Sequence, residues 1–420
     1  MMQKKSGLYS IFLFGFSSGL PFLLILSTLS IWLAEVGISK TMIGVLAWVS
    51  VPYTLKFLWG PMVDNVRIPL LTDYLGLRRS WILLAQLALW LSLIALSTTN
   101  PVLNLWSTAL FAFLVGCSSA IQDIAIEAYR IERLPQDKIG LGASVSVLGY
   151  RLGMLCSGAG TIFLAAYFDS WGMAYNCIAT CMLIGIFTSL FSAEPLVNRH
   201  KTSTDILASI KSFVRQRDWR IIIPFILSYK VADTVLNTMS MPFLLEIGFN
   251  KLEIAYVAKT FGIGAMILGG IVGGLLLHRQ EIRYNLRTCV ILQIIASGLF
   301  VLQAKLGHNV SFLFVSMGVE NFSCGMSQVA LIAYLSQLCS YHSTAMQYAI
   351  LSSFASFVRV SFSSLSGWVA DQFAWPQFYS LVAVSCVPSL LLLLVYSRHF
   401  VPNFDEDIPI EKPTLVNGEI

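Results

Sequence analysis

Charged residues are scarce in this sequence. Lys, Arg, Asp and Glu together make up 12% of its 420 residues, about half the share that is usual for a soluble domain. Hydrophobic residues make up 56% and lie in long runs. The basic residues are spread over short hydrophilic stretches, without a cluster of Lys and Arg interleaved with aromatic residues. This composition predicts an all-α polytopic membrane protein and excludes a nucleic-acid-binding one.

Catalytic and metal-binding patterns are missing as well. The five histidines lie at the ends of apolar runs, and the eight cysteines lie within such runs. No Gly-x-Ser-x-Gly elbow, Walker A loop or zinc-ligand motif occurs. We therefore expect no metal, no cofactor and no enzymatic activity. These absences oppose the alternative of a membrane-embedded enzyme or sensor.

Apolar runs of roughly 20 residues predict twelve membrane-spanning helices. Their ranges are 8–33, 42–60, 80–98, 104–129, 141–167, 173–192, 219–245, 253–277, 287–305, 309–338, 345–370 and 376–398. The longest hydrophilic interruption follows the sixth span. It divides the chain into an N-terminal six-helix half (1–192), a central loop (193–218), a C-terminal six-helix half (219–398) and a tail (399–420). The tail is polar and contains Pro, so we expect it to be disordered.

The basic residues predict the orientation of the chain. Both ends and every second loop carry most of the Lys and Arg, whereas the opposite loops carry only Lys40, Lys251 and Lys305. Because cytoplasmic loops are enriched in Lys and Arg, both termini and the central loop are expected in the cytoplasm.

The two halves resemble each other in sequence. The stretch "WLAEVGISKTMIGVLAWV" (32–49) aligns with "FLLEIGFNKLEIAYVAKT" (243–260). The alignment matches Leu33, Glu35, Gly37 and Lys40 with Leu244, Glu246, Gly248 and Lys251. Two six-helix repeats joined by a basic loop are typical of the major facilitator fold, in which two pseudo-symmetric halves enclose a central site.

Ionisable residues inside the spans mark candidate functional positions, because each costs several kcal/mol unless it is paired or hydrated. Lys230, Asp233 and Asn237 share one helix face at i, i+3 and i+7. This polar stripe is predicted to face the substrate. A structural ion pair of Lys230 with Asp233, or with Glu320, is an alternative that the pattern leaves open.

The intramembrane charges are predominantly positive. They comprise Lys56, Arg151, Lys230, Lys259 and Arg359 against Asp123, Asp233 and Glu320. An excess of buried cations predicts an anionic substrate. The three carboxylates are the candidates for proton coupling, because a carboxylate can gain and lose a proton as its surroundings change.

The stretch "CSSAIQDIAIEAYRIE" (117–132) contains three charges whose depths differ. Asp123 is expected about 10 Å from the midplane, Glu127 about 16 Å from it at the interface, and Arg130 beyond the interface. Glu127 and Arg130 are expected to form an i, i+3 pair. Because the depth of Asp123 matches that of Arg151 on the next span, we predict an ion pair between them.

The segment "GPMVDNVRIPLLTDYLGLRRS" (60–80) resembles the facilitator loop pattern of a Gly, an Asp and later basic residues. In that pattern the Asp meets the N-terminus of a neighbouring helix and its bond to a base breaks as the halves rock. Gating residues are therefore expected among Gly60, Asp64, Arg78, Arg79, Glu127 and Arg130. Asn65 stands where the pattern has a base, and about ten residues intervene before Gly76, Arg78 and Arg79, which predicts a weaker or differently wired gate.

Several longer stretches resemble the AmpG-type muropeptide permeases, a branch of the major facilitator superfamily related to acetyl-CoA transporters. These stretches are "KFLWGPMVD" (56–64), "QDIAIEAYRIERLP" (122–135), "SVLGYRLGMLCSG" (146–158), "YKVADT" (229–234), "VAKTFG" (257–262), "ENFSCGM" (320–326) and "GWVADQFAWPQFY" (367–379). The resemblance implies proton-driven import of anhydro-muropeptides across a bacterial inner membrane by a monomer embedded in lipid. Another amphiphilic anion, such as an acyl-CoA-like or small peptide cargo, is the alternative. The expected substrate contacts are Tyr150, Arg151, Lys230, Asn237, Glu320, Asn321, Gln328 and Arg359.

Overall fold

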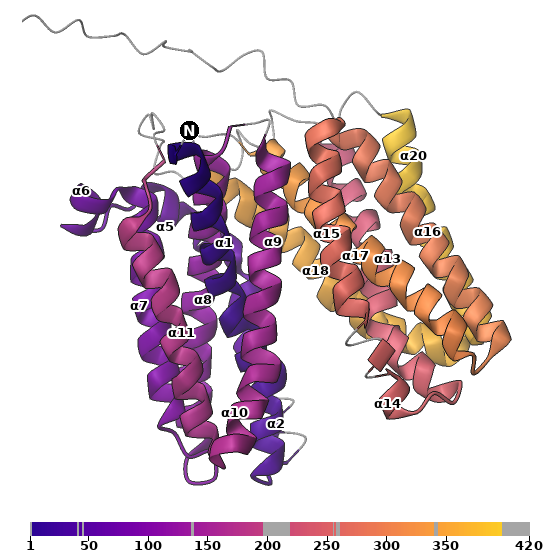
Figure 1. Cartoon of the computed structure of the whole chain (residues 1–420), viewed down its shortest axis with the longest axis horizontal. Helices are drawn as coiled ribbons and strands as arrows, with labels where there is room; N and C mark the ends of the chain where they lie inside the picture. Colours follow the sequence, from indigo (N-terminus) through magenta and orange to yellow (C-terminus); the bar gives the residue numbers. More distant parts are fainter. Residues whose placement is uncertain are drawn as a thin grey trace, which may run out of the picture.

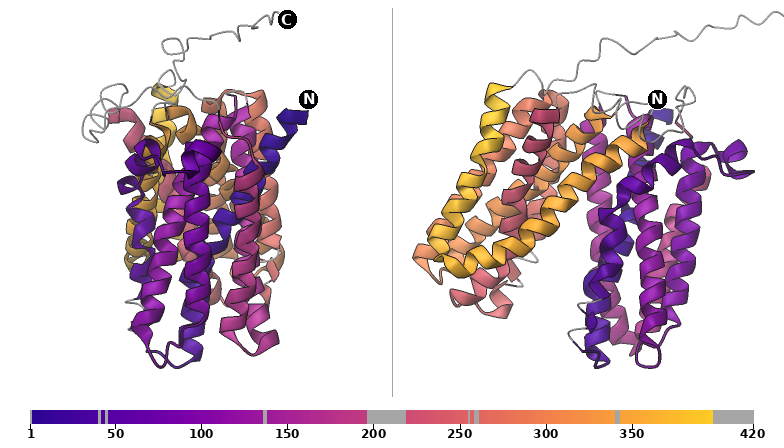
Figure 2. Two further views of the ribbon diagram at one scale, coloured as in Figure 1. Left: turned by 90° about the vertical axis from the view of Figure 1, so that its left-hand side faces the viewer. Right: turned by 180° about the vertical axis from the view of Figure 1, so that it is seen from behind.

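The computed structural model describes residues 2–39, 42–43, 46–135, 138–195, 219–254, 256–257, 261–339 and 343–396. Within these residues every regular element is a helix, and the helices form two bundles (Figures 1 and 2). The N-terminal bundle contains α1 (Met2–Leu23), α2 (Leu29–Glu35), α4 (Val51–Thr54), α5 (Gly60–Asn65), α6 (Leu71–Leu75), α7 (Leu77–Ser97), α8 (Leu105–Arg133), α9 (Ile139–Leu155), α10 (Thr161–Phe168) and α11 (Trp171–Phe191). Residues 196–218 of the predicted central loop and the tail from 399 lie outside the described residues.

The C-terminal bundle follows the same plan. It contains α13 (Trp219–Glu246), α14 (Lys251–Ile254), α15 (Gly262–Arg279), α16 (Ile282–Leu306), α17 (Val310–Leu338), α18 (Thr344–Gln372), α19 (Trp375–Ser385) and α20 (Val387–Val395). The buried apolar core of this bundle continues into the N-terminal bundle through Ile131, Ile139, Ala143 and Val147. The two bundles therefore share one packed core where α8 and α9 meet the C-terminal bundle.

Ten helices of the described chain are long and apolar enough to cross a membrane. The predicted span at 42–60 is not one continuous helix. It consists of short pieces, because Pro52 and Pro61 stand at the starts of α4 and α5 and cannot donate the hydrogen bonds that would continue a helix. The predicted span at 309–338 is present as the unbroken α17, which is not among the ten.

The predicted repeat is confirmed by backbone geometry. Gly37 and Gly248, which the two halves share, both adopt a positive φ, of 83° and 96°. Each ends a helix in the same way, since Ile38 N donates to Leu33 O at 2.9 Å and Phe249 N donates to Leu244 O at 3.0 Å. A residue with a side chain is strained at such a φ, which explains why both turns use glycine.

The starts of α8 and α17 also match. Asn104 Oδ1 accepts a hydrogen bond from Ser107 N at 3.1 Å, and Asn309 Oδ1 accepts one from Phe312 N at 3.0 Å. Each asparagine satisfies one of the free N–H groups at the start of a 29-residue helix. The same cap at the same place in both halves supports their common origin as one repeated unit.

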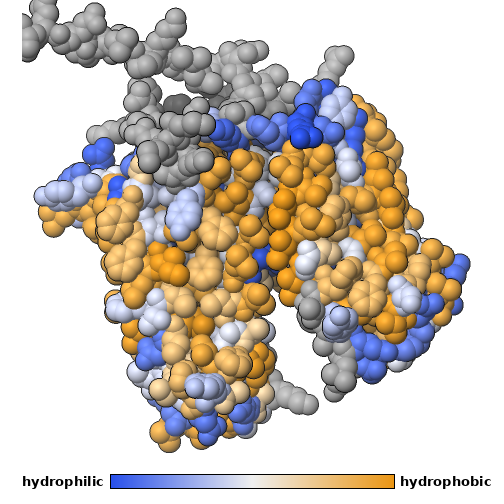
Figure 3. Space-filling view, in the orientation of Figure 1, coloured by the Kyte–Doolittle hydropathy of each residue, from blue (hydrophilic) through white to orange (hydrophobic). Residues whose placement is uncertain are grey.

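The bundles meet at one end and separate at the other. They touch near the end where α1 begins and α20 ends, and a cleft divides them at the opposite end (Figure 3). Orange apolar side chains cover much of the outer surface in this view, as expected for helices that face lipid. The terms closed end and open end are used below for these two ends.

Candidate functional site

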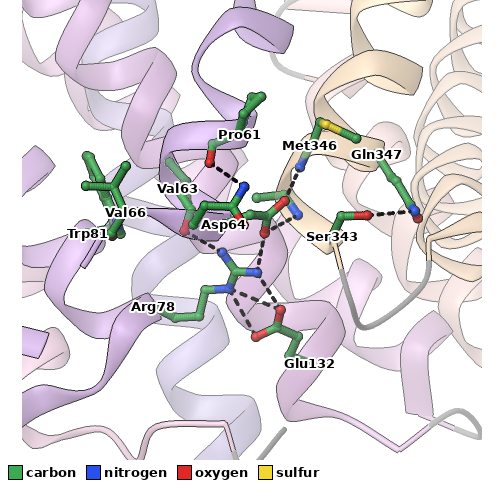
Figure 4. Close-up of polar contacts among 12 residues, drawn as sticks. Pro61, Val63, Asp64, Val66, Arg78, Trp81, Glu132, Ser343, Met346 and Gln347 are labelled. Atoms are coloured by element: carbon green, nitrogen blue, oxygen red, sulfur yellow. Dashed lines mark hydrogen bonds and ion pairs between the residues drawn. The ribbon is translucent and has the colours of Figure 1, made fainter. Parts of the chain in front are cut away.

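Arg78 forms the centre of a buried ion network at the closed end (Figure 4). Its Nη2 lies 2.6 Å from Asp64 Oδ1 and 2.6 Å from Glu132 Oε1. The Arg78 Nη1 donates to Val63 O at 2.9 Å. All three charged side chains are at most 1% exposed. The network joins α5, α7 and α8, and it keeps the Asp64 carboxylate in a fixed position.

Asp64 also binds the other bundle. Its carboxylate accepts hydrogen bonds from the backbone N–H groups of Ala345 and Met346, at 3.1 and 2.8 Å, in the first turn of α18. The N-terminus of a helix presents free N–H groups and a partial positive charge, so a carboxylate binds well there. Gly60 permits this approach, because a Cβ there would lie 2.6 Å from the Met346 Cα. Asp64 thus closes the two bundles together.

Arg79 acts within the N-terminal bundle. Glu194 accepts from the backbone N–H groups of Arg78 and Arg79 at 2.9 and 3.1 Å, which caps α7. The Arg79 Nε in turn donates to Ser189 O at 2.7 Å near the end of α11. All the contacts that the described residues give Arg79 brace α7 against α11, and none crosses to the other bundle.

Arg130 and Glu127 form the predicted ion pair. The side chain of Arg130 is only 1% exposed. It is buried because α8 packs against the C-terminal bundle at this point, and its Nη2 donates to Ser336 Oγ at 2.9 Å. Arg130 therefore joins α8 to α17 at the closed end.

The predicted pair of Asp123 with Arg151 is wrong. Asp123 instead lies 2.6 Å from Lys56 Nζ and accepts a hydrogen bond from Ser18 Oγ. The break in the second span, where Lys56 begins a short 3₁₀ helix, places Lys56 beside α8. Arg151 donates to Gln328 Oε1 of the C-terminal bundle. Depth alone was a poor guide, since helices at equal depth can face different neighbours.

The Lys56–Asp123 pair is testable by a double-mutant cycle. Each single variant, Lys56→Met or Asp123→Asn, leaves one partner unpaired at 18% or 13% side-chain exposure. We therefore expect each single variant to lose more than half of the unfolding free energy that the double variant loses. The coupling free energy is expected to be about 0.5–3 kcal/mol, measured by thermal unfolding in detergent. The same cycle on Asp123 and Arg151 is the control, and a larger coupling there would contradict this assignment.

The polar stripe of α13 is held together as predicted. Lys230 pairs with Asp233, and Asn237 Nδ2 donates to Asp233 O at 2.8 Å. The structural ion pair that the sequence left open is therefore formed with Asp233. Lys230 makes no ion pair with Glu320. Glu320 is 4% exposed, and no hydrogen bond or ion pair joins its carboxylate to another described residue.

Aromatic rings of the N-terminal bundle and one cation of the C-terminal bundle lie close together. The Arg359 guanidinium on α18 lies 5.6 Å from the centre of the Phe22 ring on α1. Phe22 packs in turn against Tyr53 and Tyr150, with ring centres 5.8 and 6.3 Å apart. Arg359 is exposed, and Tyr150 is partly exposed. The structure therefore brings Tyr150 and Arg359 together, as expected for residues of one site.

The predicted substrate contact Asn321 and the intramembrane charge Lys259 remain to be placed. Asn321 is buried, and its amide donates to Met317 O of its own helix at 2.9 Å. The side chain of Lys259 lies outside the described residues. Sequence reasoning missed Glu132, because its place in "YRIERLP" (129–135) resembles an ordinary helix end. Glu132 lies five residues beyond Glu127, about 140° away around the helix, so helical periodicity gave no signal for it.

Similarity to known proteins identifies the family of this chain. The sequence model described as Major Facilitator Superfamily matches residues 10–346. The chain belongs to the major facilitator superfamily. A candidate transporter, AmpG 4 of Rickettsia conorii, is 31% identical over 93% of this chain and 96% of the relative. AmpG 3 of Rickettsia prowazekii is 32% identical over 95% of this chain and 99% of the relative.

Solved structures agree on the fold. The transporter FucP in its outward conformation superposes with a TM-score of 0.71 over 92% of this chain and 97% of FucP, at 13% sequence identity. Major facilitator proteins move solutes across membranes, so this chain is an AmpG-type transporter rather than an enzyme. The ion network of Arg78, Asp64 and Glu132 accordingly lies at the closed end of a transporter, between its two halves.

Proposed function

We propose that this transporter imports anionic muropeptides from the periplasm into the cytoplasm together with protons. With Lys and Arg concentrated at the closed end, that end faces the cytoplasm of a bacterium and the cleft opens to the periplasm. The monomer lies in the inner membrane with both termini in the cytoplasm. The resemblance to AmpG-type permeases supports the class of substrate.

One observation carries the anionic substrate. Lys56 is paired with Asp123, and Lys230 is paired with Asp233. No described carboxylate lies at ion-pair distance from Arg151 or Arg359. Two guanidinium groups without a carboxylate at the depth of the cleft provide strong, bidentate sites for the carboxylates of a peptide.

The amphiphilic alternative also has support. A pocket of about 230 Å³ lies beside the first span in the half of the bundle away from the closed end. It is lined mainly by apolar side chains, including Ile25, Leu29, Leu33, Ile43 and Leu46. Such a lining suits an acyl chain better than a sugar, and it favours an acyl-CoA-like anion as the second candidate.

Uptake of labelled anhydro-muropeptide into proteoliposomes tests the proposal. We expect accumulation only under an imposed inward proton gradient, and we expect Arg359→Ala to weaken binding about tenfold because it removes one carboxylate site. Lys230→Ala is expected to weaken binding as well. Lack of muropeptide uptake, together with transport of an acyl-CoA-like anion, would overturn the substrate. Equal uptake with and without the gradient would overturn the coupling.

A further inference from the structure

Arg151 makes the deepest hydrogen bond that joins the two bundles in the described chain. Its position, twelve residues into α9, is about 18 Å from the start of that helix. Arg130–Ser336 and Ser144 Oγ to Gly270 O, at 2.9 Å each, are the other such bonds along these helices, and both lie nearer the closed end. The Arg151–Gln328 bond therefore lies where the cleft begins.

The partners of Arg151 leave its charge poorly satisfied. Gln328 offers only a neutral amide oxygen, and the sulfur of Met154 lies 3.9 Å from Nη1. Arg151 Nε is buried without any hydrogen-bond partner. The charge of Asp233 also acts on Arg151, from a greater distance. Asp233 itself is already bound by Lys230 and Asn237. A buried donor without an acceptor is costly, so Arg151 is ready to exchange a neutral partner for a charged one.

We propose that Arg151 and Gln328 form a latch that the substrate itself opens. A carboxylate of the substrate binds the Arg151 guanidinium and displaces the Gln328 amide. Because this bond joins α9 to α17, its loss removes the deepest polar link between the bundles as the substrate binds. This step rests on the proposed anionic substrate, and it couples binding to the separation of the halves at the closed end. A ligand shifts the equilibrium between joined and separated bundles only if it binds the two states with different affinities. The exchange of the Gln328 amide for a substrate carboxylate at Arg151 supplies that difference.

Two substitutions at Gln328 separate a latch from a merely structural contact. Gln328→Glu gives Arg151 a fixed carboxylate, which the substrate cannot displace easily. We expect its muropeptide affinity to fall at least tenfold while its unfolding temperature stays at or above that of the wild type. Gln328→Ala removes the latch, so the substrate no longer has to break it. We expect the muropeptide affinity of Gln328→Ala to rise by about two- to fivefold. Gln372→Glu, an exposed position at the far end of α18, is the matched control.

A readout without substrate tests the latch on its own. Spin labels at positions 74 and 280, in a background in which the eight cysteines are replaced, would report the distance between the bundles at the closed end. We expect Gln328→Ala to populate a longer distance and Gln328→Glu to reduce that population. Identical distance distributions in all variants, or a loss of affinity in both Gln328 variants, would overturn the latch. A wild-type protein that binds no muropeptide would overturn the proposed function, whatever the labels report.

Discussion

Arg78→Ala is expected to lower the free energy of unfolding by about 3–5 kcal/mol, the cost of removing one partner from a buried ion pair. Arg78 is 1% exposed and neutralises two carboxylates, those of Asp64 and Glu132, at 2.6 Å each. Without the guanidinium, two like charges lie close together in a buried site. The Asp64 carboxylate would keep only its bonds to the first turn of α18.

Thermal unfolding of the purified protein in detergent measures this loss. Arg79→Ala is the matched control, since Arg79 is the next residue on the same helix but binds backbone carbonyls instead of buried acids. Arg79→Ala loses two hydrogen bonds, to Ser189 O and Leu190 O, but Arg79 is partly exposed and its loss leaves no buried acid without a partner, so a smaller cost than for Arg78→Ala is expected. Equal destabilisation by the two variants would contradict the central place of Arg78 in the network.

The same variant should also weaken the closed end. Arg78 holds Asp64 in position while Asp64 binds α18. The loss of Arg78 is therefore expected to weaken the hydrogen bonds between Asp64 and the first turn of α18. Asn65 stands where the facilitator pattern has a base. Arg78 reaches Asp64 across the longer segment, because α6 and the preceding turn bring the start of α7 back beside α5. The Asp64 carboxylate is therefore fully paired at the closed end.

The parts of the site that could be predicted are those that local sequence controls. Glycine at 37 and 248 follows from the shape of a helix end, and the stripe of Lys230, Asp233 and Asn237 follows from helical periodicity. Asp64 was found because its role depends on a helix start that a short motif describes. Each of these features needs only one helix or one turn.

The parts that could not be predicted depend on how neighbouring helices are rotated. The equal depths of Asp123 and Arg151 predict an ion pair between them, but depth along a helix says nothing about the direction of a side chain around it. The breaks at Pro52 and Pro61 changed the course of the second span and placed Lys56 beside Asp123. Glu132 was missed for the same reason, since only the packing of α7 against α8 shows that it is buried.

The second large effect is expected at Glu320. Its carboxylate is buried on α17, and no cation among the described residues lies at ion-pair distance. An ionised carboxylate without a partner is costly inside a membrane, so a proton is expected to stay bound while Glu320 is buried, as in this structure, and to leave when the cytoplasm-facing state exposes the carboxylate to water. Glu320→Gln keeps the shape and the neutral form but cannot release a proton. We expect it to abolish accumulation driven by a proton gradient and to retain exchange of labelled for unlabelled substrate.

Asp233→Asn provides the contrast that makes this result specific. Asp233 already has a cation, Lys230, and its loss leaves that cation unpaired in the binding stripe. We therefore expect Asp233→Asn to reduce exchange as well as accumulation, whereas Glu320→Gln reduces accumulation alone. Both activities can be measured in the same proteoliposomes, with and without a gradient. Gradient-driven accumulation by Glu320→Gln at the wild-type level would remove Glu320 from proton coupling, and exchange retained only in Asp233→Asn would transfer that role to Asp233.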